Sequence, residues 1–124
     1  MIYSREVING FKLLEKAPSI SDKNEFFFEA ESEDRSLGVW VKCQMLIEKE
    51  IIKEVNFFIF GCPDTLVSAN KIKSIIQNQA IHDVKYIDML GIRKNLNIPV
   101  EKMGKILVIE NAFQECLKVF FLKR

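Results

Sequence analysis

The sequence predicts an α+β domain in which one helix precedes a three-stranded antiparallel sheet and three helices follow it. Two observations carry this prediction: three strand-like runs lie between residues 26 and 60, and amphipathic helical spacing fills most of the remaining chain. A sheet of only three strands needs helices against one face to be stable, so we expect the helices to pack there. At 124 residues, we expect 1–124 to form a single domain around one core.

The first helix is expected over residues 3–17, where apolar side chains recur at helical spacing. Strands are then expected at 26–30, 39–45 and 51–60. Every odd position of the second strand is apolar, which is the alternation of a half-buried strand, and Trp40 interrupts its polar side. Because short polar links separate the three runs, an antiparallel sheet is the simplest arrangement.

Helical spacing returns in the second half of the chain, first at 64–78 and then at 86–95. We expect a loop containing Pro99 and Gly104, followed by a last helix over about 107–122. The apolar face expected for the first of these three helices contains Leu66, Ala69, Ile72, Ile75 and Ile76.

Composition excludes several classes of protein. The chain has 18 Lys and Arg against 17 Asp and Glu, so a net charge of +1 argues against nucleic-acid binding by bulk electrostatics. No run approaches the roughly 18 apolar residues of a membrane span, and the start lacks the apolar region of a signal peptide. Three cysteines make an odd, sparse set that favours a reducing compartment, for which the cytoplasm is the default.

The most informative motif is the junction 60–65, where a strand is expected to end and a helix to begin. Gly61 permits an unusual turn, while Pro63 and Asp64 suit the first turn of a helix. Cys62 would then lie at a helix N-terminus, where the macrodipole favours the thiolate that a metal, a cluster or a sulfur-transfer partner requires. The alternative is that Cys62 is merely a small residue packed in a tight turn.

The other candidates favour structural roles. Cys43 is in phase with the apolar side of its strand and Cys116 lies on the apolar stripe of the last helix, so both are expected in the core. No pair of cysteines has C-x-x-C spacing, so no self-contained zinc site is encoded. His82, next to Asp83, is expected in a solvated loop or helix cap. No general base accompanies Cys62 in the sequence, which argues against an enzyme.

Four separated segments nevertheless resemble one family, the iron–sulfur cluster assembly scaffolds of the IscU and NifU N-terminal type. The opening 1–9 contains Tyr-Ser followed by Val-Ile-Asn, and 57–69 contains Phe-Gly-Cys before a helix. Segment 96–102 is similar to the Leu-Pro-Pro-Val-Lys motif that the family's chaperone recognises, and 110–112 is similar to the Glu-Asp-Ala opening of its last helix. The resemblance implies the fold predicted above, in an IscU/NifU-N-like form.

The resemblance also implies a ligand set, and this chain departs from it. Family scaffolds hold a [2Fe–2S] cluster or zinc with three cysteines, an aspartate and a histidine, and here only the middle cysteine matches, as Cys62. Counting along the chain places the first cysteine at Ser36, the aspartate at Gly38, and the His-Cys pair at Gly104 and Lys105. Serine is a poor soft ligand, a protonated lysine repels a metal ion, and one thiolate cannot replace four ligands. The expected cluster site is therefore degenerate.

Three functions remain open on this basis. The first is a scaffold or carrier of an iron–sulfur cluster, iron or zinc, completed by a homodimer or a partner protein through Cys62. The second is a metal-free binding or regulatory module that docks a cysteine desulfurase or a chaperone. The third is an enzyme with Cys62 as nucleophile. The residues implied in chaperone recognition are Ile98, Pro99, Val100, Glu101 and Lys102, with Val100 in place of the motif's second proline.

Overall fold

A computed structural model describes residues 25–123. Strands β1 (Phe27–Asp34), β2 (Val39–Glu48) and β3 (Ile51–Phe60) form one antiparallel sheet in the order β1-β2-β3. This arrangement confirms the predicted sheet. The helix expected at 3–17 lies outside the described residues.

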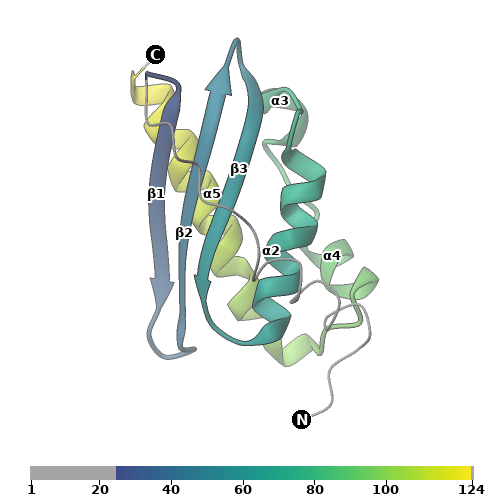
Figure 1. Ribbon diagram of the computed structural model, residues 1–124. Helices are drawn as coiled ribbons and strands as arrows, with labels where there is room; N and C mark the ends of the chain where they lie inside the picture. The colour runs from purple at the N-terminus through teal and green to yellow at the C-terminus, as the bar shows by residue number, and fades with distance from the viewer. Residues whose placement is uncertain (1–24, 124) are drawn as a thin grey trace.

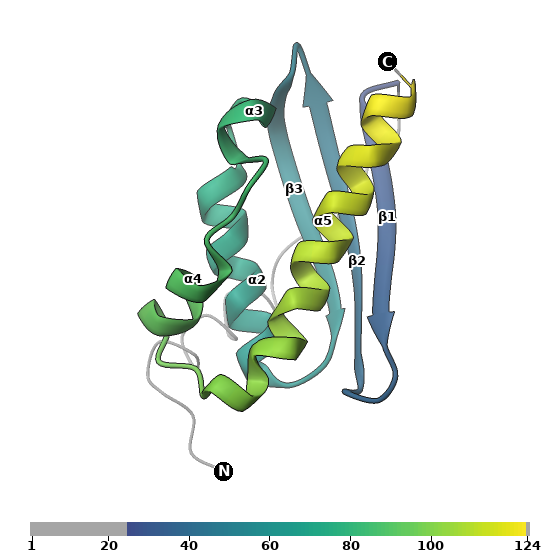
Figure 2. The ribbon, with the colours of Figure 1, turned by 180° about the vertical axis from the view of Figure 1, so that it is seen from behind.

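Helices follow the sheet and cover one of its faces. In the two opposite views, α5 crosses the sheet behind β1 and β2, whereas α2 lies beside β3 (Figures 1 and 2). The α+β class with helices on one face is therefore as the sequence predicts. The helical elements are α2 (Pro63–Ile76), α3 (Ile81–Val84), α4 (Met89–Asn95), the 3-10 helix η1 (Val100–Lys102) and α5 (Met103–Lys123).

Several elements differ from the expectation, among them β2, which ends at Glu48, and α4, which begins at Met89. Strand β1 continues to Asp34 through a stretch expected as a polar link, because each of its residues pairs with β2. The short helix α3 occupies a stretch expected as loop. Helix α5 begins at Met103, so Gly104 lies within a helix and not in a loop. The Leu37 side chain packs where a Gly104 side chain would project, with Leu37 Cδ1 3.1 Å from the Cβ position.

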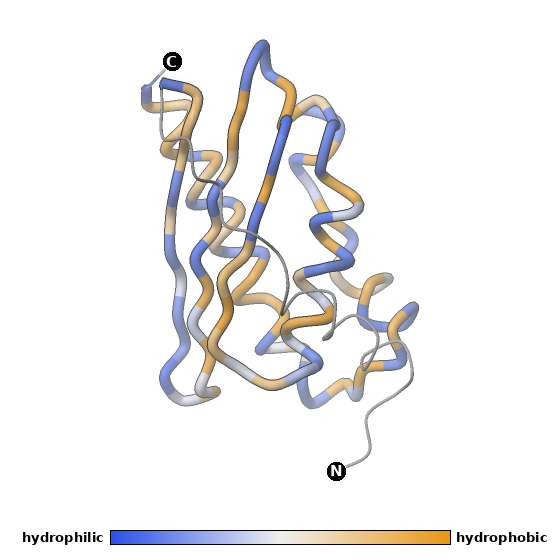
Figure 3. The backbone as a smooth tube through the Cα atoms, in the orientation of Figure 1, coloured by the Kyte–Doolittle hydropathy of each residue, from blue (hydrophilic) through white to orange (hydrophobic). Residues whose placement is uncertain are grey.

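The core lies between the sheet and the two long helices. Hydrophobic and hydrophilic residues alternate along parts of the strands (Figure 3), and the apolar residues Val39, Val41, Cys43, Met45 and Ile47 of β2 are buried. Cys43 and Cys116 are both fully buried there, as expected. In α2, Ile72 and Ile76 are buried as expected, but Ile75 is 37% exposed. Within residues 25–123, no helix is long and apolar enough to cross a membrane.

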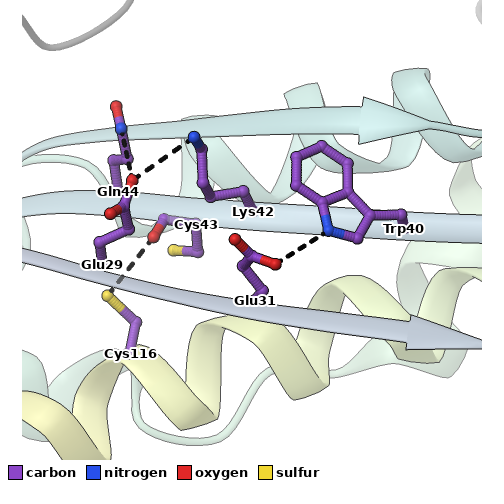
Figure 4. A network of polar contacts seen from close by, with 7 residues as sticks. All are labelled: Glu29, Glu31, Trp40, Lys42, Cys43, Gln44 and Cys116. Carbon is purple, nitrogen blue, oxygen red and sulfur yellow. Dashed lines mark hydrogen bonds and ion pairs between the residues drawn. The ribbon is translucent and has the colours of Figure 1, made fainter.

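The opposite face of the sheet carries a polar network (Figure 4). The Glu29 carboxylate accepts a 2.8 Å hydrogen bond from the Gln44 amide and lies 3.6 Å from the Lys42 ammonium. Trp40 donates its indole N–H to Glu31 at 3.1 Å. This bond explains how an aromatic residue fits on the polar side of β2, where it interrupts the alternation.

Candidate functional site

Cys62 lies at the turn between β3 and α2 and is the N-cap residue of that helix. Its backbone is extended (φ −88°, ψ 166°), and its carbonyl accepts from the Thr65 and Leu66 N–H groups at 3.0 and 3.3 Å. Pro63 occupies the first turn, where its missing N–H leaves nothing unsatisfied. The predicted position of Cys62 at a helix N-terminus is therefore found.

The turn does not depend on an unusual conformation of Gly61. Among the described residues, the one glycine with a positive φ is Gly38, at +68°. A side chain at Gly61 would instead meet the Thr65 side chain at 3.4 Å. The expectation of an unusual turn at Gly61 was wrong, and an added side chain there would make ordinary contact with the first turn of α2.

The surroundings of Cys62 favour its thiolate. Burial would by itself raise the pKa of the half-buried Cys62 thiol. The Thr65 hydroxyl, 3.5 Å from the sulfur, and the Thr65 backbone act in the opposite direction, as do the positive charges of Lys105 and Lys102. The outcome is a pKa below that of an ordinary thiol.

A buried ion pair adjoins this turn. The Lys102 ammonium donates to the Asp64 carboxylate at 2.5 Å, and the two side chains are only 13% and 6% exposed. Asp64 is in the first turn of α2, two residues after Cys62, while Lys102 ends η1. Sequence reasoning missed this pair, because Asp64 reads as a helix-start residue and its partner is 38 residues away.

Three segments that the resemblance connects lie at one end of the molecule. The β1–β2 turn, the start of α2 and the start of α5 gather at the end where β3 terminates (Figures 1 and 2). Leu37 in the β1–β2 turn touches the Gly104 position, and Lys105 acts on Cys62. The β1–β2 turn and the first turn of α5 therefore lie at the same end of the molecule as Cys62.

The residues at these positions do not fit a cluster held by one subunit. Ser36 uses its hydroxyl to donate to Asp34 at 2.6 Å, and it is a poor ligand for iron. Gly38 and Gly104 have no side chain, and Lys105 is cationic. Within residues 25–123, no three His, Cys, Asp or Glu side chains group closely enough to hold a metal ion. A [2Fe–2S] cluster bound by protein thiolates alone needs four of them, and this site supplies one.

The segment 98–102, expected to be recognised by a chaperone, has exposed and anchored parts. Pro99, Val100 and Glu101 are exposed, Val100 by 67%, whereas Ile98 is 1% exposed. Arg93 on α4 holds the start of the segment: its guanidinium donates to the Ile98 carbonyl at 2.9 Å. Arg93 is a second residue that sequence reasoning missed.

His82 lies away from this site. It is on α3, beyond the far end of α2 from Cys62, and its Nε2 is 3.4 Å from the Asp83 carboxylate. Both side chains are more than half exposed. The two buried cysteines also contribute nothing here, since the Cys116 thiol donates to the Cys43 carbonyl in the core at 3.8 Å.

Comparison with known proteins decides the family. The sequence model of the NifU-like N-terminal domain matches residues 2–124. The chain belongs to this family. It is 26% identical to the iron–sulfur cluster assembly scaffold protein IscU of Rickettsia prowazekii over 125 aligned positions, which cover 100% of this chain and 95% of the relative.

Other relatives agree on the family and differ in length. IscU of Plasmodium falciparum is 29% identical over 83 residues, which cover 67% of this chain but only about half, 51%, of that protein. A crystal structure of a Fervidobacterium islandicum AW-1 protein, assigned as an iron–sulfur cluster assembly scaffold for the SUF system, superposes with a TM-score of 0.74. At 17% identity, over 93% of this chain and 96% of that one, this match shows the fold. The family-level function is that of an iron–sulfur cluster assembly scaffold.

Proposed function

We propose that this NifU-like protein takes part in iron–sulfur cluster assembly by carrying a single sulfur atom on Cys62. A second subunit or a partner protein would supply the other ligands whenever a cluster is built. The observation that supports this role is the environment of Cys62, a half-buried thiol whose pKa is lowered by Thr65, Lys105 and Lys102. An anionic persulfide benefits from the same positive charges as a thiolate.

The chemistry requires no external oxidant or reductant. The Cys62 thiolate attacks the outer sulfur of a persulfide, R–S–SH, carried by a cysteine desulfurase. A bond forms between Cys62 Sγ and that sulfur, the S–S bond of the donor breaks, and the donor leaves as the thiolate R–S⁻. Cys62 then carries S–SH, whose proton is lost to water to give the anionic persulfide beside Lys105. The cluster, where one is made, is cargo and not a resident cofactor.

A second role, docking without metal, is supported by a different observation. Phe60 is 73% exposed directly before the Cys62 turn, and Val100 is 67% exposed on η1. Exposed apolar side chains beside a functional site suit the binding of a partner protein. A cysteine desulfurase would dock at the Cys62 end, and a chaperone would take the segment 98–102. On this account the chain regulates or competes with a scaffold that holds the cluster.

The decisive test separates sulfur acceptance from cluster binding. The protein and Cys62→Ser are incubated anaerobically with a cysteine desulfurase and cysteine, and the masses of the intact proteins and of their peptides are measured. We expect wild type to gain the mass of one sulfur atom on the peptide containing Cys62, and the variant to gain none. Cys43→Ser is the matched control, because Cys43 is fully buried and should leave the gain unchanged.

Reconstitution with iron and sulfide completes the test. For the sulfur-carrier role, wild type alone should give no stoichiometric visible chromophore, because one thiolate per subunit is too few. A chromophore that depends on Cys62 and appears with dimer formation would indicate a shared cluster. If neither sulfur nor iron binds, the docking role remains.

A further inference from the structure

We propose that segment 98–102 is a strap latched to the Cys62 turn by the Asp64–Lys102 ion pair, so that the charge carried at Cys62 sets how tightly the strap is held. This coupling goes beyond sulfur acceptance, because it links the occupancy of the site to the availability of an exposed segment. It does not depend on which chemical group occupies Cys62.

Side chains hold the strap at its two ends, and residues 99–101 between them are exposed. At its start, Arg93 and Ile98 exchange two hydrogen bonds: Ile98 N–H donates to the Arg93 carbonyl at 3.1 Å, and the Arg93 guanidinium donates to the Ile98 carbonyl at 2.9 Å. At its end, Lys102 binds Asp64. Between them, η1 has no buried residue and no side-chain cap. Such a segment depends on its end contacts to stay in place.

The latch is buried. Asp64 is 6% exposed and Lys102 13%, so water screens their attraction weakly. Asp64 also lies in the first turn of α2, where a negative charge is stabilised by the helix N-terminus. The carboxylate therefore keeps a favourable partner if Lys102 leaves, which makes opening of the strap possible without unfolding α2.

The latch is coupled to Cys62 by charge. Lys102 stabilises the Cys62 thiolate as well as the Asp64 carboxylate. Cys62 and Asp64 both lie at the start of α2. Attraction is mutual, so an anion on Cys62 also holds Lys102 in place. A neutral group on Cys62 removes part of that attraction on Lys102.

Two alkylating reagents of similar size test this directly. Iodoacetamide leaves a neutral group on Cys62 and iodoacetate leaves a carboxylate, while Cys43 and Cys116 are buried and protected. Amide hydrogen exchange of peptides covering 98–104 is then followed by mass spectrometry on the folded protein. We expect the neutral group to raise exchange by about threefold and the carboxylate to leave it near the wild-type rate. Equal effects of the two reagents, or no effect of either, would overturn the coupling.

Substitutions test the latch itself. Asp64→Asn and Lys102→Met should each raise exchange over 98–104 by about tenfold, and Lys102→Arg should preserve protection. Glu101→Gln, an exposed change in the same strap, is the matched control and should have no effect. In Lys102→Met, the neutral and the charged alkyl group on Cys62 should have the same effect on amide exchange over 98–104. An unchanged rate in Asp64→Asn or Lys102→Met, or an equal rise in Glu101→Gln, would refute the latch. Because no desulfurase is used, failure here is distinguishable from failure of sulfur transfer.

Discussion

Lys105 in the first turn of α5 lowers the pKa of Cys62 at the start of α2. The resemblance places the family's third cysteine at Lys105. A position implied as a sulfur ligand therefore carries a group that stabilises sulfur anions without binding metal. On the role proposed above, this substitution favours holding a charged sulfur over holding a cluster.

The first prediction concerns the reactivity of Cys62. Lys105→Met should raise the pKa of the thiol, so less thiolate is present at neutral pH and alkylation slows severalfold. The rates of variant and wild type should converge at alkaline pH, where both thiols are ionised. Lys94→Met, an exposed lysine of α4, is the control and should leave the profile unchanged. If Lys105→Met and wild type are alkylated at the same rate at every pH, Lys105 does not act on Cys62.

The second prediction restores the ligands that the resemblance implies. The double variant Ser36→Cys, Lys105→Cys places thiols in the β1–β2 turn and the first turn of α5, beside Cys62. We expect it to bind stoichiometric zinc, or to give a visible chromophore after anaerobic reconstitution, where wild type does not. Adding Cys62→Ser to the double variant should abolish binding. Failure to bind any metal would mean that these positions do not converge as proposed.

The third prediction concerns Gly91 in α4. Its N–H donates to the Asp88 carboxylate at 2.9 Å, and an added Cβ would overlap that carboxylate. Gly-to-Ala substitution within a helix normally stabilises by about 1 kcal/mol, and loss of a cap costs about the same. Gly91→Ala should therefore give no net gain in wild type. In an Asp88→Ala background it should stabilise by about 1 kcal/mol, measured by urea unfolding; an equal gain in both backgrounds would contradict the clash.

The fourth prediction concerns Glu110, whose pKa is raised by burial in α5. Folding therefore favours its protonated form, and this contribution is present below the ordinary glutamate pKa and lost as pH rises through the folded value. Glu110→Gln should raise the melting temperature at neutral pH, and the difference should vanish in acid. Glu101→Gln, at an exposed position, provides the control. A Glu110→Gln protein that melts below wild type at neutral pH would rule out this account.

Local pattern was enough to predict the sheet and the long helices, because alternation in β2 and helical spacing in α2 record burial directly. Local pattern did not predict the bounds of elements that are fixed by contacts with residues distant in the sequence. Strand β1 extends past Glu31 because β2 continues to pair with it, and Glu31 there accepts the Trp40 indole N–H. Gly104 lies in α5, and Leu37 of the β1–β2 turn packs against it.

The same limit applies to the site. The position of Cys62 could be read from Gly61 and Pro63, because a strand end and a helix start are local features. The Asp64–Lys102 pair could not, since it joins residues 38 positions apart. Lys105 falls at a family ligand position and Lys102 does not, and local pattern did not indicate that Lys102 would also act on the thiol.

The chain's single tryptophan pairs with Phe60, the residue directly before the Gly61–Cys62 turn. Trp40 is half-buried and its indole is fixed by Glu31. Indole emission depends on such surroundings, so the protein contains its own optical reporter for the functional turn. Binding of a partner over Phe60 is therefore expected to change the Trp40 emission of the unlabelled wild-type chain, and Trp40→Phe is the reference that lacks this signal.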